Sequence, residues 1–194
     1  GDGSSSATVG HGLGVTPELI IQKRLDSSTK GDWQISVKDV GVGYLNFTNA
    51  FSTTFGSSGR LAYNTNTSTV YKFGAGSSDV TSVNTDGADY IAYCFSSVEA
   101  YSKVGTFTGN ASTNGPFVHT GFKPAYILTK MIENASSYWR IFDATRETYN
   151  PRVKELYTNT NGAEYANTGT DPQLDFLSNG FKIRSSYAHF NGSG

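Results

Sequence analysis

Two histidines, His11 and His119, occupy matching places in the sequence, each followed by a glycine, a proline and an apolar run. Imidazole nitrogen is a common metal ligand, but a metal site needs several ligands, and no further His or Cys lies at ligand spacing from either residue. The pattern therefore favours histidines that hold turns by hydrogen bonding. The sequence predicts no metal site and no other cofactor.

The two tryptophans, Trp33 and Trp139, also occupy matching places, and each begins a run in which apolar and polar residues alternate. An exposed indole can stack on the C–H face of a sugar ring, whereas an indole at the start of a half-buried strand more often packs in the core. Both interpretations stay open, and both tryptophans are candidates for ligand binding.

A third set of candidates combines tyrosine with asparagine, the mixture that binding loops use for rigid contact area and adaptable hydrogen bonds. These residues fall in polar stretches between apolar runs, and loops of this kind are where recognition normally sits. The alternative is a set of polar loops without a ligand. The candidates are Tyr63, Asn64, Tyr157, Asn159 and Tyr165.

Residues that could catalyse a reaction do not form a recognisable arrangement. Asp143 and Glu147 flank Arg146, but a glycosidase needs two carboxyls facing each other across a cleft at ~5–10 Å, and the sequence does not place them so. Cys94 stands in the most apolar run, where a thiol stays protonated and inert. The stretch 84–89 lacks the distal glutamate of a calcium loop. We therefore expect no enzymatic activity.

The elements that carry these residues are predicted to be short β-strands. Charged residues make up 16% and aromatic residues 13% of the 194 positions, and apolar and polar residues alternate in short runs between turn residues. This pattern is typical of sandwiches and barrels. We predict an all-β fold, a β-sandwich of the jelly-roll-like or concanavalin-like kind.

The chain also repeats itself at an interval of about 107 residues. The pairs at this interval include Gly14 with Gly121, Pro17 with Pro124 and Lys23 with Lys130. Self-similarity at a fixed period indicates a repeated structure. We predict a first β repeat over residues 1–100 and a second over 101–194, as two domains or as one integrated sandwich.

The segment 90–95 is apolar on both faces, which is typical of a strand in the middle of a sheet. Its counterpart in the second repeat would begin about where the sequence stops. We therefore expect the second repeat to lack its last strand, and the sequence to be a window of about two periods from a longer protein.

Net charge and apolar content limit the partners. The net charge is −1 and the lysines and arginines form no basic cluster, so nucleic acid is not an expected partner. No apolar run reaches the ~20 residues that span a bilayer, so membrane insertion is not expected either. A single cysteine excludes an intrachain disulfide.

Several runs resemble a repeat family found in tail-fibre and other virion structural proteins of marine bacteriophages and in marine metagenomic sequences. The runs are GHGLGVTPELIIQKR, YLNFTNA, YIAYCFSSVEAYSKVGTFTGN, GPFVHTGFKPAYILTK and DFLSNGFKIR. In that family a YIYMAFAE-like strand follows the GFKIR-like strand, and this sequence stops before it. The resemblance implies a virion location and assembly with other fibre or virion subunits as a homo-oligomer, with a trimer as the common form. It transfers no activity and no functional residues.

The sequence thus predicts a non-enzymatic structural and adhesion module of a phage tail fibre or similar appendage, with a host-surface glycan as its ligand. The alternative is a carbohydrate-binding module of a secreted, extracellular bacterial protein.

Overall fold

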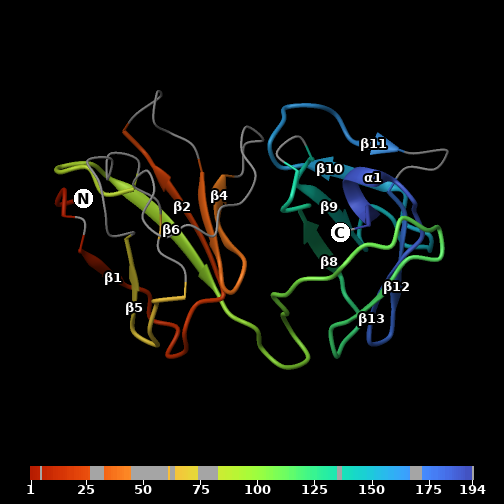
Figure 1. The fold of residues 1–194 in the computed structure, drawn as a ribbon, viewed down its shortest axis with the longest axis horizontal. Helices are drawn as coiled ribbons and strands as arrows, with labels where there is room; N and C mark the ends of the chain where they lie inside the picture. Colours follow the sequence, from red (N-terminus) through yellow and green to blue (C-terminus); the bar gives the residue numbers. More distant parts are fainter. Residues whose placement is uncertain are drawn as a thin grey trace. The chain divides into compact units, whose positions relative to one another are not determined.

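The structure, a computed structural model, is almost entirely β, which confirms the predicted all-β class. It describes residues 1–4, 6–26, 33–44, 61, 64–73, 83–134, 137–166 and 172–193. The chain divides into two compact units, Gly1–Ser97 (unit 1) and Val98–Gly194 (unit 2), and each is described by itself. Figure 1 shows the strands of both units and the single short helix of the described residues.

The described residues of unit 1 form one antiparallel sheet and one ribbon. The sheet has the order β4-β3-β2-β6, and β1 pairs with β5 in a separate two-stranded ribbon. The strands are β1 (Thr8–Gly10), β2 (Leu19–Arg24), β3 (Gln34–Val37), β4 (Gly41–Tyr44), β5 (Val70–Lys72) and β6 (Tyr90–Phe95).

The core of unit 1 joins the sheet to the ribbon. Ile20 of β2, Val42 of β4 and Tyr71 of β5 belong to one buried cluster, which Leu61, Phe73 and Val83 complete. Ile20 and Gln22, two positions apart on β2, are both buried, as the alternation of side chains along a strand requires. Gln22 is the polar exception: its Nε2 donates to the carbonyl of Val83 (2.7 Å), and its Oε1 accepts from the hydroxyl of Tyr71 (2.9 Å).

Among the described strands, β6 stands at the end of the order β4-β3-β2-β6, next to β2, whereas its two apolar faces predicted a place in the middle of a sheet. Ala92 and Cys94 pack against the core cluster. On the opposite face Tyr93 and Phe95 are each 46% exposed. An exposed aromatic face, and not burial on both sides, is therefore what the double apolar pattern encodes in the described part of unit 1.

In the described part of unit 2 the strands form two antiparallel sheets, of order β11-β10-β9-β8 and β12-β13-β7. The strands are β7 (Phe117–His119), β8 (Tyr126–Thr129), β9 (Arg140–Asp143), β10 (Lys154–Tyr157), β11 (Tyr165–Ala166), β12 (Leu174–Leu177) and β13 (Gly180–Ile183), and helix α1 is Ala188–Asn191. The core again joins the two sheets, because Ile127 of β8 and Phe142 of β9 share one buried cluster with Phe176 of β12 and Phe181 of β13.

In each unit a buried asparagine forms hydrogen bonds with the backbone of a segment much earlier in the sequence. In unit 1 the amide of Asp2 donates to the Oδ1 of Asn84 (3.1 Å), and the Nδ2 of Asn84 donates to the carbonyl of Ser4 (2.8 Å). In unit 2 the amide of Asn110 donates to the Oδ1 of Asn191 (3.0 Å), and the Nδ2 of Asn191 donates to the carbonyl of Ser112 (2.8 Å). We call these two arrangements the asparagine clamps.

Three local features complete the fold. Residues 188–191 form the helix α1, in which the amide of Asn191 donates to the carbonyl of Tyr187 (2.8 Å). Gly41 and Gly43 belong to β4 because they pair with β3. The segment 101–108 forms no strand; Ser102 makes only an isolated bridge to Val98.

Candidate functional site

Two of the candidate tyrosines, Tyr157 and Tyr165, lie beside a buried ion pair in unit 2. Arg140 of β9 donates through Nη1 to the Oε2 of Glu155 in β10 at 2.6 Å, and the two side chains are only 2% and 1% exposed. The hydroxyl of Tyr157 donates to the other oxygen of Glu155 at 2.7 Å. The strand register explains the contact, because Tyr157 lies directly opposite Arg140 and opposed side chains share a face of the sheet.

Three tyrosine rings surround the guanidinium of Arg140. Its Cζ lies 5.7 Å from the ring centre of Tyr138, 5.3 Å from that of Tyr157 and 5.4 Å from that of Tyr187. A cation at this distance from aromatic faces is attracted by their negative quadrupole. Tyr138 and Tyr157 also stack on each other, with ring centres 4.3 Å apart and planes 17° apart.

A fourth tyrosine extends this group towards solvent. Tyr165 of β11 is the cross-strand partner of Glu155 and the diagonal neighbour of Tyr157, within reach of a long side chain. Tyr138 is 39% and Tyr165 46% exposed. We call Tyr138, Tyr157, Tyr165 and Tyr187 the tyrosine cluster. It presents exposed aromatic area on a support fixed by a buried ion pair.

Burial and the neighbouring carboxylate both act on Tyr157. Burial raises the pKa of its hydroxyl, and the hydrogen bond to Glu155 raises it further. The hydroxyl therefore stays protonated at neutral pH and acts as a donor to Glu155. The Nε of Arg140 is buried without a hydrogen-bond partner among the described residues, so the aromatic rings, and not further hydrogen bonds, compensate that side of the guanidinium.

The two tryptophans lie in different surroundings. Trp33, directly before β3, is half-buried; its ring centre lies 6.1 Å from that of Tyr93 in a stacked arrangement, and the Nζ of Lys23 lies 5.4 Å from the indole. Trp139, directly before β9, is only 5% exposed. Trp33 with Tyr93 thus offers aromatic surface to a ligand, and Trp139 offers very little.

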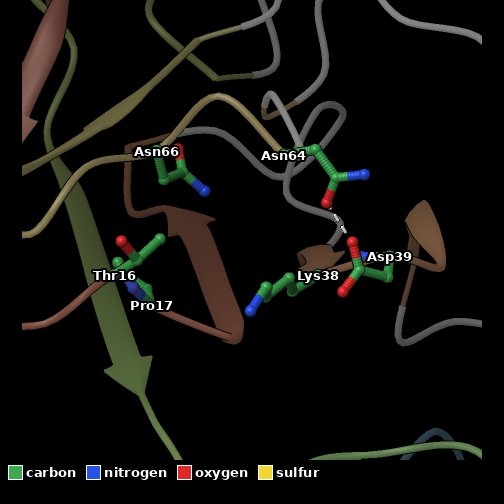
Figure 2. A pocket seen from close by; sticks show the side chains of 6 residues that line it. All are labelled: Thr16, Pro17, Lys38, Asp39, Asn64 and Asn66. Carbon is green, nitrogen blue, oxygen red and sulfur yellow. Dashed lines mark hydrogen bonds between the residues drawn. The ribbon is translucent and has the colours of Figure 1, made fainter.

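The remaining candidates from the tyrosine and asparagine set are dispersed. Tyr63 lies outside the described residues. Asn159 follows β10, and its Oδ1 is buried without a hydrogen-bond partner within the described ranges. Asn64 lines a polar pocket of unit 1 together with Thr16, Pro17, Lys38, Asp39 and Asn66 (Figure 2).

The polar pocket has a volume of about 210 Å³ and a rim that is fixed by hydrogen bonds. The amide of Asp39 donates to the Oδ1 of Asn64 at 2.8 Å, drawn as the dashed line in Figure 2. The Oδ1 of Asn66 accepts from the amide of Lys72 at 3.0 Å. Asp39 and Asn64 both have a left-handed backbone, with φ of 61° and 57°. Asn and Asp tolerate this conformation better than most residues.

His11 stabilises a turn by hydrogen bonding, which is the role that the sequence pattern favoured. Its Nδ1 accepts from the amide of Leu13 at 3.2 Å, so the proton lies on Nε2, which contacts the carbonyl of Thr67 at 3.1 Å. His119 ends β7, with its ring 6.4 Å from that of Phe117. Within the described ranges no group of three or more His, Cys, Asp or Glu residues could hold a metal ion.

The acidic residues near β9 are engaged in local structure. The carboxylate of Asp143 pairs with the guanidinium of Arg146 and accepts from the amide of Arg146 at 2.8 Å. Burial raises the pKa of Asp143, but these hydrogen bonds outweigh burial and leave the pKa below its ordinary value. Glu147 accepts from the amides of Val153 (2.7 Å) and Lys154 (3.0 Å). A general acid needs a raised pKa, which Asp143 does not have.

Cys94 faces the core cluster, and burial raises the pKa of its thiol. Asn84, considered at the start of a calcium-like loop, is committed to the asparagine clamp. Among the described residues, no helix is long and apolar enough to cross a membrane.

Sequence reasoning missed several members of both groups: Tyr138 and Tyr187 of the tyrosine cluster, and Lys38 and Asp39 of the polar pocket. The sequence did contain an indication of Tyr138. Tyr138, Arg140 and the buried Phe142 occupy every second position, so they lie on one face of β9 and of the residues directly before it. No comparable pattern brings Tyr187 to the same place, because it lies 47 positions beyond Arg140.

Comparison with known proteins gives one family match. No curated protein and no solved structure matches the chain. A family model described as "Domain of unknown function (DUF7483)" matches residues 1–194, and the chain therefore belongs to that family.

Proposed function

We propose that this protein is a non-enzymatic adhesion module that binds glycan through the tyrosine cluster of unit 2. The observation that carries the proposal is the stacked pair Tyr138–Tyr157 beside the exposed ring of Tyr165, all three on one face of the sheet. Aromatic faces complement the C–H faces of sugar rings, and tyrosine adds a hydroxyl that can donate to or accept from the hydroxyls of a sugar.

The buried ion pair supports the proposal through preorganisation. A binding surface loses affinity when its side chains must be ordered on contact with the ligand. Arg140 and Glu155 hold Tyr157 by a hydrogen bond and by the contact of the guanidinium with the ring. The ring therefore has little freedom left to lose when a sugar stacks on the cluster.

The engagement of the nearby acids supports a role without catalysis. Asp143 is paired with Arg146 and Glu147 accepts two backbone amides. Neither carboxylate is set up as the acid or base of a glycosidase, which needs two carboxyls facing one substrate.

We further propose that each unit is one copy of a β-sandwich repeat of about 107 residues. Three similarities support this: the antiparallel pair β2–β3 corresponds to β8–β9, the ribbon β1–β5 corresponds to β7–β13, and each unit has an asparagine clamp. In both units a single core cluster lies between the sheets, as in sandwiches.

The tail-fibre context of the proposal depends on the sequence resemblance alone. In that context the module is carried on a virion appendage, assembles with other subunits into a homo-oligomer such as a trimer, and multiplies weak contacts by being present in several copies. The alternative, a carbohydrate-binding module of a secreted bacterial protein, is favoured by the half-buried Trp33 stacked on Tyr93.

A glycan array probed with the 194-residue protein tests the function. We expect binding to a subset of glycans, reduced about three- to tenfold by Tyr138→Ala or Tyr165→Ala, because an aromatic contact contributes ~0.5–1.5 kcal/mol. Tyr149→Ala is the matched control, since Tyr149 is 83% exposed in the same unit and outside the tyrosine cluster. An array without binding, or equal losses for all three variants, would contradict the proposal.

Light scattering of the same protein separates the two contexts. A stable trimer agrees with a fibre subunit, whereas a monomer that binds soluble polysaccharide agrees with a carbohydrate-binding module.

A further inference from the structure

The polar pocket of unit 1 combines two charged side chains of opposite sign with amides fixed by hydrogen bonds. Neither the Nζ of Lys38 nor the carboxylate of Asp39 has an ion-pair or hydrogen-bond partner among the described residues. Figure 2 shows the Nζ of Lys38 and the amide nitrogen of Asn66 pointing towards the space between the lining residues, with the Asp39 carboxylate at the rim. The pocket thus offers an ammonium and an amide nitrogen as donors beside a carboxylate as acceptor.

The backbone of the pocket is arranged before any ligand arrives. The hydrogen bond from Asp39 to Asn64 joins two residues that are 25 positions apart, and both have a left-handed backbone. The bond from Lys72 uses the Oδ1 of Asn66, and within the described ranges the Nδ2 of Asn66 has no acceptor. Asp39 and Asn66 are thereby fixed on different sides of one small space.

The size and chemistry of this space select the ligand class. Its volume of about 210 Å³ is below the ~300 Å³ at which pockets for drug-sized ligands begin, so the occupant is a single small ring. A carboxylate accepts hydrogen bonds from hydroxyls, while an ammonium and an amide nitrogen donate to them. Pro17 and Thr16 complete the lining with ring and methyl carbon atoms, against which C–H groups can pack.

We propose that this pocket binds one neutral monosaccharide ring, as a terminal sugar of a glycan. Asp39 accepts from sugar hydroxyls, and Lys38 and Asn66 donate to sugar oxygens. The inference relies on the proposed glycan-binding function for its ligand class and adds a second contact in the other unit. A single small site of this kind binds in the millimolar range, and its contribution grows when several copies engage one surface.

The test is a titration of the isotope-labelled 194-residue protein, followed by the amide signals in two-dimensional NMR spectra. The probes are the methyl glycosides of glucose, galactose and mannose, with glycine as a zwitterionic comparison, each up to ~50 mM, where a millimolar site is largely filled. We expect at least one glycoside to shift the amides of Asp39 and Asn64, and glycine to shift neither.

The variant Asp39→Asn sharpens the test, because asparagine keeps the size and tolerates the left-handed backbone while removing the charge. We expect at least a tenfold loss of affinity at the pocket, since hydrogen bonds to a charged group are roughly twice as strong as neutral ones. Asp89→Asn, which removes an exposed carboxylate of unit 1 outside the pocket, should leave the affinity unchanged.

The readout separates this inference from the function proposed above. Shifts of the Tyr157 and Tyr165 amides without shifts of the Asp39 and Asn64 amides would refute the monosaccharide pocket and leave glycan binding by the tyrosine cluster standing. Shifts at Asp39 and Asn64 alone would support the pocket and count against the cluster. No shift with any glycoside, or shifts with glycine only, would also refute the pocket.

Discussion

Unit 1 and unit 2 place different polar groups at the same point of their sheets. Gln34 begins β3 and Arg140 begins β9, each directly after a tryptophan, and both side chains are buried. The neutral amide stands without a charged neighbour at its cross-strand position, where β2 supplies Gln22. The guanidinium requires a carboxylate and three aromatic rings. The rings that compensate the buried charge of Arg140 therefore also belong to the aromatic surface of unit 2.

The two units also differ in the pairing of β2 in unit 1 and of the corresponding strand β8 in unit 2. Strand β2 pairs with β3 on one side and with β6 on the other, whereas β8, among the described strands, pairs only with β9. The core isoleucines reflect this, because Ile20 of β2 is 1% and Ile127 of β8 is 8% exposed. Pairing on both edges buries the strand more completely, which predicts unequal stability of the two positions.

The largest loss of stability is expected at the Arg140–Glu155 ion pair, where the two units differ most. Glu155→Ala leaves the guanidinium of Arg140 buried without its carboxylate, which should lower the free energy of unfolding by about 3–5 kcal/mol. Gln34→Ala in unit 1 should lower it by no more than ~1–3 kcal/mol, because no charge is left uncompensated. Urea denaturation of both variants measures the difference.

The double variant Arg140→Met with Glu155→Leu is the control for this prediction. Apolar replacement of a whole buried ion pair is often neutral or stabilising, so the double variant should recover most of the stability lost in Glu155→Ala. A double variant as unstable as the single one would show that the loss comes from packing and not from the unpaired charge.

Replacement of the core isoleucines of β2 and β8 should give the next largest losses of stability. Ile20→Ala and Ile127→Ala should each lower the free energy of unfolding by about 2–5 kcal/mol, because each removes buried side-chain volume. We expect the larger loss for Ile20, which is held from both strand edges. Hydrogen exchange offers an independent check: amides of β8 should exchange faster than the corresponding amides of β2. Equal losses of stability and equal exchange rates would contradict the prediction that pairing on both edges makes β2 more stable than β8.

The asparagine clamps should contribute less and about equally. Asn84→Ala and Asn191→Ala each leave backbone groups of the opposite segment unsatisfied, at a cost of about 1–3 kcal/mol. Asn191 also donates to the carbonyl of Ser185 at 2.7 Å, so its replacement should cost somewhat more. Thermal unfolding of both variants beside Asn161→Ala, an exposed asparagine of unit 2, measures these costs; values near that of the control would contradict a structural role.

The smallest effect concerns Lys130, whose Nζ donates to the carbonyls of Met131 (2.6 Å) and Asn134 (2.7 Å) and to the hydroxyl of Ser137 (2.7 Å). Burial lowers its pKa from 10.5 to about 8. Between these two pH values the unfolded chain binds more protons than the folded protein, so the free energy of unfolding should rise with pH. The rise should stay below ~1 kcal/mol, because the side chain is partly screened by solvent.

Comparison with Lys130→Gln isolates this rise, since other groups titrate in the same range and remain in the variant. Side-chain NMR of the lysines gives the pKa directly. A Lys130 signal that titrates at the ordinary lysine value of 10.5 would disprove the lowered pKa.

Alternation of residues was sufficient to predict most strands, because one face of each sheet meets a core. The run into β3 alternates Trp33, Ile35 and Val37 with polar residues, and β2 and β8 begin with short apolar runs. Strand β1 escaped prediction because its Thr-Val-Gly is exposed throughout, and β11 because it has only two residues. Helix α1 is set by contacts of Asn191 with residues near 110, which no local pattern encodes.

The candidate site was predictable in its residue types but not in its geometry. Tyr157 and Tyr165 were identified because tyrosine and asparagine mark binding loops, yet both belong to strands. The contact of Tyr138 with Tyr157 depends on the register of β9 against β10, which a single sequence does not fix. The polar pocket depends on a bond between Asp39 and Asn64 across 25 positions, beyond any local motif.

The asparagine clamps determine how each unit would respond to mechanical load. In unit 2 the bonds of Asn191 to Asn110 bridge 81 positions of the chain. A pulling force applied at residue 110 and at residue 191 would act on several parallel hydrogen bonds before it reached the core. The intervening length of polypeptide would stay folded until those bonds ruptured together.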